Sequence, residues 1–269
     1  MFSNIQFLQL MLTARMNTLL LTQKFLSPKY HLIKSHHELY FCKFNDTCFP
    51  FRMGAHYRRS GFVGTEQDID VAQIITHENY HNPLRYSHDI ALLKLAKPAK
   101  MGKGVGLACL PYSVSPSLPL DNPNKKCWIT GWGTLSLEGS QPNALMQASV
   151  PLVSKQRCLK GYPGAIHDSM LCAGLDEGGV DACLGDSGGP LVCEYNGKWY
   201  LEGATSWGHG CERPNKYGVY AKVRGLMPWI LKKMNGNVVP PPPETPTPPQ
   251  PTTTQTPPTT TPSGNKFLL

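Results

Sequence analysis

The sequence predicts an all-β domain between residue 52 and about residue 235, and three observations support this fold class. Short β-branched and aromatic runs alternate there with Gly, Pro and Asn turns, the rhythm of a β-sandwich or barrel. Nine cysteines include no C-x-x-C pair, which favours disulfides in an oxidising compartment over a zinc ribbon or a thioredoxin motif. A chain of 269 residues accommodates one large all-β domain or two small ones.

Five segments of this region have the composition of strands. In chain order they are IALLKL (90–95), KCWITGWG (126–133), PLVCEY (190–195), KWYLEGATSW (198–207) and YGVYAKV (217–223). The segment MPWILKKM (227–234) differs, because its apolar residues fall at helical spacing and its basic residues come late. It predicts an amphipathic helix that closes the domain.

The two ends of the chain differ from the middle. Residues 1–51 show no clear period and no motif, so they stay unassigned. Of the 23 residues from 240 to 262, 11 are Pro and 9 are Thr, a composition that cannot bury a core. The tail, residues 236–269, is therefore expected to be disordered. Its Pro/Thr-rich part is either an extended stalk that carries O-linked sugars or a plain linker to a further domain.

Charge and hydropathy exclude several function classes. The net charge of +8 is dispersed, and residues 52–235 carry +5 of it without the basic stripe and interleaved aromatics of a nucleic-acid-binding surface. No apolar run is long enough to span a membrane, and the interrupted apolar stretch at 7–21 is a poor signal peptide. The cysteines nevertheless favour a secreted, extracellular protein, and no cofactor or metal is expected.

The stretch DACLGDSGGPLVC (181–193) carries the strongest chemical signal. It holds Ser187 in a glycine-rich turn, which exposes the hydroxyl and lets the amides of Gly185 and Ser187 point at one spot. Two such donors suit the oxyanion of an acyl-transfer intermediate. A serine hydroxyl is a weak nucleophile unless a histidine accepts its proton, so a catalytic role for Ser187 requires a histidine elsewhere in the chain.

With its neighbours, this stretch resembles the nucleophile block of the trypsin-like, chymotrypsin-fold serine endopeptidases. Four further blocks resemble that family in the family's order over residues 52–235: SHDIALLKL (87–95), CWITGWGTL (127–135), TSWGHGC (205–211) and NKYGVYAKV (215–223). The resemblance implies two antiparallel six-stranded β-barrels with a C-terminal helix, and an active site in the cleft between the barrels.

Site residues follow from the resemblance position by position. It implies Ser187 as nucleophile, Asp89 as the triad aspartate, Gly185 and Ser187 as oxyanion hole, Ser206 beside the buried aspartate, and Gly208 and Gly218 as walls of the specificity pocket. Asp181 falls at the base of that pocket. A carboxylate at the base of an apolar slot selects Arg or Lys, because an unpaired buried charge is costly.

The cysteines fit the same resemblance. It implies disulfides between Cys127 and Cys193, between Cys158 and Cys172, and between Cys183 and Cys211. Cys109 matches the position that bridges to a pro-segment in many relatives. Cys42 and Cys48 have no counterpart, so either one of them pairs with Cys109 or they pair with each other.

Two expected segments are missing. The catalytic histidine should precede Asp89 by about 45 residues, near Phe44, but the stretch FCKFNDTCF contains no histidine. Of the nine histidines, His37 is the nearest substitute. The cleavage sequence that creates a new amino terminus, which pairs in relatives with the residue matched by Asp186, is also absent. Residues 1–51 look too irregular to replace the missing strands, so the first barrel is expected to be incomplete.

Two functions are therefore weighed. The first is a secreted serine endopeptidase that cleaves proteins or peptides after Arg or Lys. This form of the protease would be inactive if the chain is an alternative product that lacks the segment with the catalytic histidine. The intact specificity pocket favours this explanation for the missing histidine. The second is a pseudoprotease, a binding module that holds basic peptide segments in the Asp181 pocket.

Overall fold

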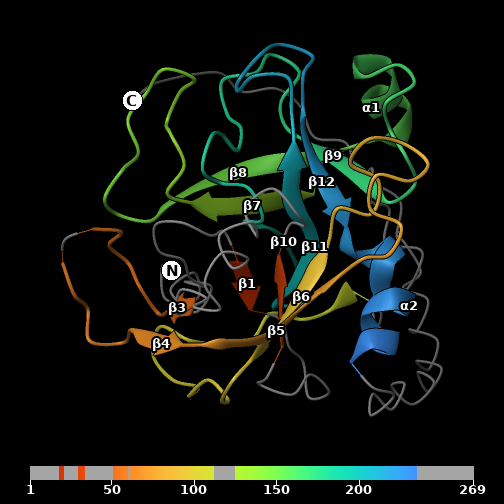
Figure 1. Cartoon of the computed structure of the whole chain (residues 1–269). Coiled ribbons are helices and arrows are strands. Elements are labelled where there is room, and N and C mark those ends of the chain that lie inside the picture. Colours follow the sequence, from red (N-terminus) through yellow and green to blue (C-terminus); the bar gives the residue numbers. More distant parts are fainter. Residues whose placement is uncertain (1–17, 21–29, 34–50, 60, 112–124, 235–269) are drawn as a thin grey trace, which may run out of the picture. The chain divides into compact units, whose positions relative to one another are not determined.

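The structure, a computed structural model of the whole chain, describes residues 18–20, 30–33, 51–59, 61–111 and 125–234 (Figure 1). Several positions singled out in the sequence lie outside these ranges, namely His36, His37, Cys42, Cys48 and the tail from residue 236. In the described part, no helix has both the length and the apolar character needed to cross a membrane.

The second half of the domain forms a closed barrel of six antiparallel strands, paired in the order β10-β11-β12-β9-β8-β7 (Figure 1). Its strands are β7 (Lys126–Gly131), β8 (Met146–Val153), β9 (Met170–Ala173), β10 (Pro190–Tyr195), β11 (Lys198–Trp207) and β12 (Gly218–Lys222). Apolar side chains that include Ile129, Leu191 and Tyr220 fill its interior. Closure leaves every strand with two neighbours and removes unpaired edges.

The hairpin between β10 and β11 illustrates how the sequence specifies this barrel. The strands pair from Tyr195–Lys198 outward, so Asn196 and Gly197 alone make the connection. Both residues have positive φ, 48° and 70°, as a two-residue type I′ turn requires. The Asn-Gly dipeptide is the strongest short-range hairpin signal, which explains why both strands could be predicted.

The first half contains six strands in two sheets. A four-stranded sheet has the order β1-β2-β6-β5, and β3 pairs with β4. The strands are β1 (Thr18–Leu20), β2 (Tyr30–Ile33), β3 (Phe51–Met53), β4 (Gln67–Ile69), β5 (Val71–Thr76) and β6 (Ala91–Leu95). Phe51, Met53 and Ile69 share one core with Leu93 and Leu95, so the two sheets pack on each other. Within the described ranges these sheets do not close into a barrel.

Residues 1–51 contribute more than the sequence indicated, because they supply β1 and β2. Strand β2 pairs with β6 from Tyr30–Lys94 to Ile33–Ala91. Without β2 that edge of β6 would expose a row of unpaired backbone donors and acceptors. Strands of three and four residues show too little alternation to be recognised in the sequence. The all-β class is confirmed, and the arrangement is that of the chymotrypsin fold.

Two helices flank the closed barrel. Helix α1 (Lys155–Gly161) was not predicted and begins after Ser154, whose hydroxyl accepts a hydrogen bond from Arg157 N at 3.3 Å. Helix α2 (Val223–Lys233) begins four residues before the predicted helix. Pro228 lies inside α2, where it removes one backbone hydrogen bond, and this explains why the earlier start was missed.

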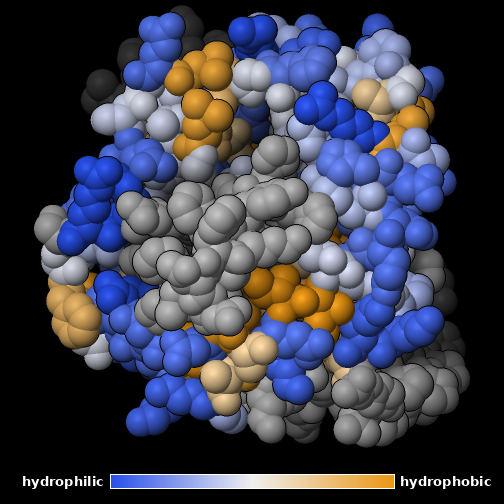
Figure 2. Space-filling model, in the orientation of Figure 1, coloured by the Kyte–Doolittle hydropathy of each residue, from blue (hydrophilic) through white to orange (hydrophobic). Residues whose placement is uncertain are grey.

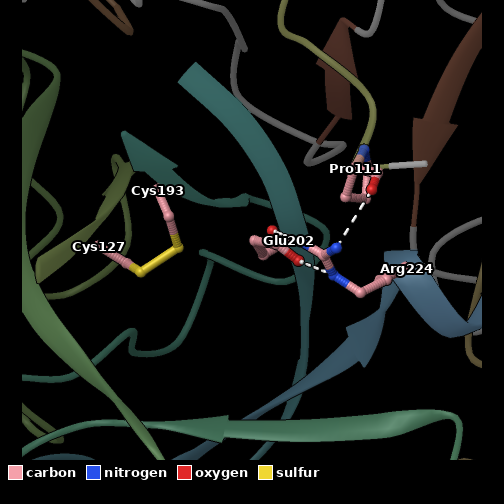
Figure 3. Close-up of polar contacts among 5 residues, drawn as sticks. All are labelled: Pro111, Cys127, Cys193, Glu202 and Arg224. Carbon is pink, nitrogen blue, oxygen red and sulfur yellow. Dashed lines mark hydrogen bonds and ion pairs between the residues drawn. A yellow bond between two sulfur atoms is a disulfide. The ribbon is translucent and has the colours of Figure 1, made fainter. Parts of the chain in front are cut away.

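Three disulfides cross-link the second half, with the pairings that the resemblance implied: Cys127–Cys193, Cys158–Cys172 and Cys183–Cys211. Figure 3 shows the first of them, which joins β7 to β10, together with a buried ion pair between Arg224 and Glu202. Arg224 also donates to Pro111 O at 3.2 Å. Because both charges have partners, this pair holds the first turn of α2 against β11. Cys109 is buried and carries a free thiol.

Candidate active site

The turn that carries Ser187 is fixed by its own backbone and by β11. Asp186 N donates to Cys183 O at 3.0 Å, and Gly189 N donates to Asp186 O at 2.8 Å. Gly188 N donates to Thr205 O of β11, also at 2.8 Å. Gly188 has a φ of +79°, a conformation that favours glycine. The turn therefore presents Ser187, which is half-buried, from a fixed backbone.

Two backbone N–H groups of this turn are available as hydrogen-bond donors. Among the described residues, no acceptor is hydrogen-bonded to the N–H of Gly185 or of Ser187, whereas the N–H groups of Asp186, Gly188 and Gly189 are all used. Gly185 has a φ of +98°, and a Cβ there would lie only 2.4 Å from Gln141 Nε2. Glycine is thus required for the turn that leaves both donors available. Such a pair of donors can bind a developing oxyanion.

Asp89 lies beside the same part of β11. Its side chain is buried, and its Oδ2 accepts a hydrogen bond from Ser206 Oγ at 2.6 Å. Thr205, the preceding residue, is the one that binds the Ser187 turn. Two neighbouring residues of one strand therefore hold the backbone of the Ser187 turn and the side chain of Asp89, although Ser187 and Asp89 are 98 positions apart in the chain.

Histidine rings engage other groups in the described part of the chain. The rings of His77, His81 and His88 bond to backbone atoms of Asn79, Tyr86 and Asn82, and the ring of His167 bonds to Ser169. None of these four rings bonds to Ser187 or Asp89. The side chains of His31, His36 and His37 lie outside the described residues. The rings of His56 and His209 contact the rings of Tyr57 and Tyr162, and no hydrogen bond to Ser187 identifies any histidine of the described residues as the general base.

Asp181 lies at a partly buried position near two residues of β12. Its Oδ1 accepts a hydrogen bond from Ala182 N at 2.8 Å, and burial raises the pKa of its carboxyl to about 7. A Cβ on Gly218 would lie 2.7 Å from Asp181 Oδ1, so a larger residue would displace this carboxylate. Among the described residues, no cation forms an ion pair with it.

Tyr220 is a further site residue, which the sequence analysis missed. Its hydroxyl is buried and has no hydrogen-bond partner among the described residues, and a Cβ on Gly218 would lie 2.9 Å from it. Residues 218 and 220 share one face of β12, so the strand alternation could have placed Tyr220 beside the predicted wall glycine. An orphaned hydroxyl next to a buried carboxylate can satisfy a bound polar or cationic group.

The other predicted wall residue, Gly208, is in open surroundings. It is exposed, and a Cβ added to it would meet its nearest neighbour, Gly210 O, only at 3.5 Å. Gly208 thus differs from Gly218, where close neighbours already exclude a side chain. The space beside Gly208 is free for an entering ligand.

A cavity of about 210 Å³ has three acidic residues, Asp181, Asp186 and Glu212, among its lining residues. Ser187 does not line this cavity. Asp186 accepts hydrogen bonds from Gly133 N at 2.7 Å and from Cys183 N at 3.0 Å, and burial raises the pKa of its carboxyl. The chemistry of this cavity suits an ammonium group. In the described ranges, no cluster of His, Cys, Asp or Glu is arranged to hold a metal ion.

Comparisons with known proteins give the family. The trypsin family model matches residues 42–230, a range that begins after His31, His36 and His37. The chain is 43% identical to Trypsin-3 of Salmo salar over 175 residues, 65% of this chain and 69% of that protein. It is 45% identical to Transmembrane protease serine 9 of Rattus norvegicus over 183 residues, 67% of this chain and 17% of that protein.

Among solved structures, the fold resembles neuropsin, described as a serine protease expressed in the limbic system of mouse brain. The TM-score is 0.65 at 37% identity, and the match covers 81% of this chain and 88% of that one. The chain therefore belongs to the trypsin family of serine proteases.

Proposed function

We propose that this protein is a serine endopeptidase that cleaves proteins or peptides after Arg or Lys through an acyl-enzyme intermediate. One observation carries the proposal: the amides of Gly185 and Ser187, on either side of Asp186, have no hydrogen-bond acceptor in the described part of the chain. An oxyanion hole needs two such donors beside the nucleophile. Loss of one donor costs about 3 kcal/mol of transition-state stabilisation in enzymes of this kind.

The specificity follows from the surroundings of Asp181. An Arg or Lys side chain that enters past Gly208 meets a buried carboxylate and the unpaired hydroxyl of Tyr220. The bound cation ionises Asp181 and lowers its pKa from about 7, because an opposite charge favours the ionised form. A neutral side chain would leave both polar groups unpaired, at a cost of several kcal/mol.

The reaction then has two steps. Ser187 Oγ attacks the peptide carbonyl carbon, its proton passes to the base, and the two amides bind the oxygen that becomes negative. The C–N bond breaks, and the base returns the proton to the leaving amine. In the second step water attacks the acyl-enzyme by the same route and releases the acid. Asp89, held by Ser206, orients the base.

The base in this proposal is a histidine outside the described residues, and His37 is the candidate that the chain offers. The variant His37→Ala is expected to lose peptide hydrolysis by a factor of about 10³ or more, because serine is then not deprotonated. The neighbouring variant His36→Ala is the matched control and should hydrolyse as the parent does. Equal activity in both variants would exclude His37.

Labelling with a fluorophosphonate probe tests the proposed function directly. Prompt modification of the folded chain, mapped by mass spectrometry to Ser187 and lost in Ser187→Ala, is the expected result. Binding of benzamidine is measured in parallel, since an arginine-like amidine should bind the Asp181 pocket. Asp181→Ser is expected to weaken benzamidine by about 100-fold, the loss of one buried charge pair. Benzamidine binding without labelling would overturn the enzymatic proposal.

That last outcome defines the second candidate function, a pseudoprotease that binds basic peptide segments without cleaving them. Two observations favour this function. The rings of four histidines form hydrogen bonds to groups other than Ser187 and Asp89, namely His77, His81, His88 and His167. The family match begins at residue 42, after His37. The pocket would be used in the same way, and Asp181→Ser would abolish binding of Arg-containing peptides. Labelling therefore separates the two functions, whereas benzamidine binding does not.

We also infer that the protein is exported to an oxidising compartment. Its three disulfides support this, because such bonds persist outside the reducing cytosol. Residues 52–235 are proposed as the protease domain and residues 236–269 as a disordered Pro/Thr-rich stalk, on composition. Cys109, buried and free, remains the candidate for a bond to a pro-segment.

A further inference from the structure

A column of aromatic rings lies between helix α2 and the loop 77–88, which connects β5 to β6. Trp229 of α2 stacks on His77 with ring centroids 4.8 Å apart, and His77 stacks on His88 at 4.6 Å. The ring of His167 follows that of His88 at 5.0 Å. We define these four residues as the ring column. Its three histidines are half-buried, and no step of the proposed function uses them.

Two histidines of the column are hydrogen-bonded in a way that fits only a neutral ring. Asn79 N donates to His77 Nδ1 at 3.1 Å, and Ser169 N donates to His167 Nδ1 at 3.2 Å. A backbone N–H can only donate, so each of these ring nitrogens carries a lone pair and no proton. An imidazolium has a proton on both nitrogens. Protonation of either ring therefore breaks its bond to the backbone.

The same residues fix the chain on both sides of Asp89. After Asp89, Ile90 O accepts a hydrogen bond from His77 N at 3.1 Å. Before Asp89, His88 N donates to Ser169 Oγ at 2.8 Å, and Ser169 is itself held through its amide by the second neutral ring. The aspartate that orients the base in the proposed function is thus held between two groups of the column.

The backbone of the loop 77–88 does not favour its conformation by itself. His81, Tyr86 and His88 have φ values of 64°, 64° and 53°, in the left-handed region that non-glycine residues disfavour. Contacts with the rest of the domain must therefore hold the loop. Figure 1 places the loop beside α2, and Figure 2 shows mainly hydrophilic residues on that side of the molecule, so protons from solution reach the column.

The surroundings of the two neutral rings disfavour a positive charge on them. Burial, and next the neighbouring ring of His88, lower the pKa of both His77 and His167. The other charged groups near these rings are two ion pairs and one further cation: Glu78–Lys233, Asp168–Lys155 and Lys222. Each ion pair brings one charge of either sign to its ring, so burial and the ring of His88 decide the direction.

The direction of the pH effect follows from these lowered values. A histidine of the unfolded chain titrates at about 6.5, whereas both rings hold protons less readily in the folded arrangement. Above about pH 6.5 the rings are neutral in both states and cost nothing. Below it, the opened loop binds more protons than the closed one, so acid favours opening.

We propose that His77 and His167 are positioning residues for Asp89 and act only as neutral rings. When both gain protons in mildly acidic solution, the loop 77–88 is released and Asp89 no longer orients the base. The catalytic effect rests on the proposed function, whereas the release of the loop does not. The arrangement restricts proteolysis to neutral and alkaline surroundings.

Hydrogen exchange of the full chain, followed by mass spectrometry at about pH 7.5 and about pH 5 and corrected for intrinsic rates, tests the release of the loop. Amides of residues 79–90 should lose at least about tenfold of their protection at the lower pH. Amides of the hairpin between β10 and β11 should change by less than about twofold. Unchanged protection of residues 79–90 at about pH 5 would overturn the proposal.

The double variant His77→Asn/His167→Asn separates charge from structure. Asn places an acceptor oxygen near the position of Nδ1 and does not titrate, so protection of the loop should be equal at the two pH values. The variant His77→Ala/His167→Ala lacks both acceptors and should have low protection at both. His209→Asn changes an exposed histidine of the second half and is the matched control, which should behave as the parent does. An acid-induced loss in the Asn variant as large as that in the parent would contradict the proposal.

Titration of the parent by NMR gives a check that needs no variant. The rings of His77 and His167 should titrate below about 6.5, and titration of both at or above that value would overturn the proposal.

Fluorophosphonate labelling of Ser187 tests the catalytic effect. Relative to its rate at about pH 7.5, labelling of the parent at about pH 5 should fall at least about threefold further than that of the Asn variant. Equal pH profiles would show that the two rings do not position Asp89. Absence of labelling in every protein at neutral pH would instead overturn the proposed function and with it the role of Asp89, while the exchange measurement decides the release of the loop.

Discussion

The two halves of this domain arrange their β-strands differently. Residues 126–222 form a continuous closed barrel in which every strand has two partners and three disulfides fix the connections. The first half assembles six strands into two sheets that remain open in the described ranges, and two of those strands come from short segments far upstream. The closed half holds Asp181 and Ser187, whereas the first half holds Asp89 and, in the proposed function, the base.

In the proposed function, substrate recognition and catalysis therefore depend on different halves of the domain. Asp181, Gly218 and Tyr220 need only the closed barrel for their placement. The base must be placed by segments of the first half.

Removal of the disulfide inside the closed barrel has the largest expected effect. Cys127 and Cys193 are 66 positions apart, so their bond restricts a long loop of the unfolded chain. The double variant Cys127→Ala/Cys193→Ala should lose about 4 kcal/mol of unfolding free energy, measured by denaturant titration. The bond between Cys158 and Cys172 spans 14 positions, and its removal should cost about 3 kcal/mol. The reverse order of these two losses would contradict the loop-entropy reasoning.

Replacement of Asp181 by Asn should make stability less dependent on pH. Burial raises the pKa of this carboxyl from 3.8 to about 7 in the folded protein, so ionisation penalises the fold. The contribution of Asp181 to the unfolding free energy, measured as the difference between the parent and Asp181→Asn, is thus fully present below about pH 4. It is lost as pH rises through about 7. The difference above pH 7 amounts to roughly 4 kcal/mol at most. A difference that does not change between pH 4 and 8 would show an ordinary, solvated carboxylate.

Two core leucines compare the halves directly. Leu191 lies inside the closed barrel and Leu93 lies in the core shared by the two open sheets, both fully buried. Each change to Ala should cost about 3 kcal/mol. In hydrogen exchange, Leu93→Ala should lower protection mainly in the first half, because its core cluster consists of first-half side chains apart from Trp132 and Leu145. Leu191→Ala should lower protection throughout the closed barrel. Identical exchange patterns would mean that the halves unfold as one unit.

The smallest expected effect concerns helix α1. Ser154 accepts a hydrogen bond from Arg157 N, so Ser154→Ala should cost about 1 kcal/mol in thermal or chemical unfolding. Ser154→Asp retains the cap and should restore the parent stability. An unchanged stability in Ser154→Ala would mean that packing of Cys158 alone holds the helix.

The sequence predicted most of the closed half, for identifiable reasons. The Asn-Gly turn and the cysteines mark their elements locally, and β7, β10, β11 and β12 lie within two residues of their predicted ranges. In the first half, the run IALLKL marks β6 equally well. Strand β8 was missed because Pro151 interrupts its pattern. Strands β1 and β2 were missed because they become strands only by pairing with β6, a contact that no local pattern records.

The candidate site also contains residues that the sequence predicted and contacts that only the structure showed. Gly185, Ser187 and Asp181 occupy one stretch and could be read together, and Asp89 could be placed by resemblance. Tyr220 became visible only when the structure showed its hydroxyl without a partner. The contact between Ser206 and Asp89 joins residues 117 positions apart, and only the folded chain shows its length of 2.6 Å.

The central claim, that Ser187 and Asp181 serve one bound arginyl peptide, is tested most directly with two phosphonate esters that differ in one group. One carries a benzamidine side chain and the other a phenyl side chain, and the rate of Ser187 modification is followed by mass spectrometry. We predict that the amidine ester reacts at least about 100-fold faster, and that Asp181→Asn removes this preference. Equal rates for the two esters, no reaction with either, or an adduct at another residue would contradict the account.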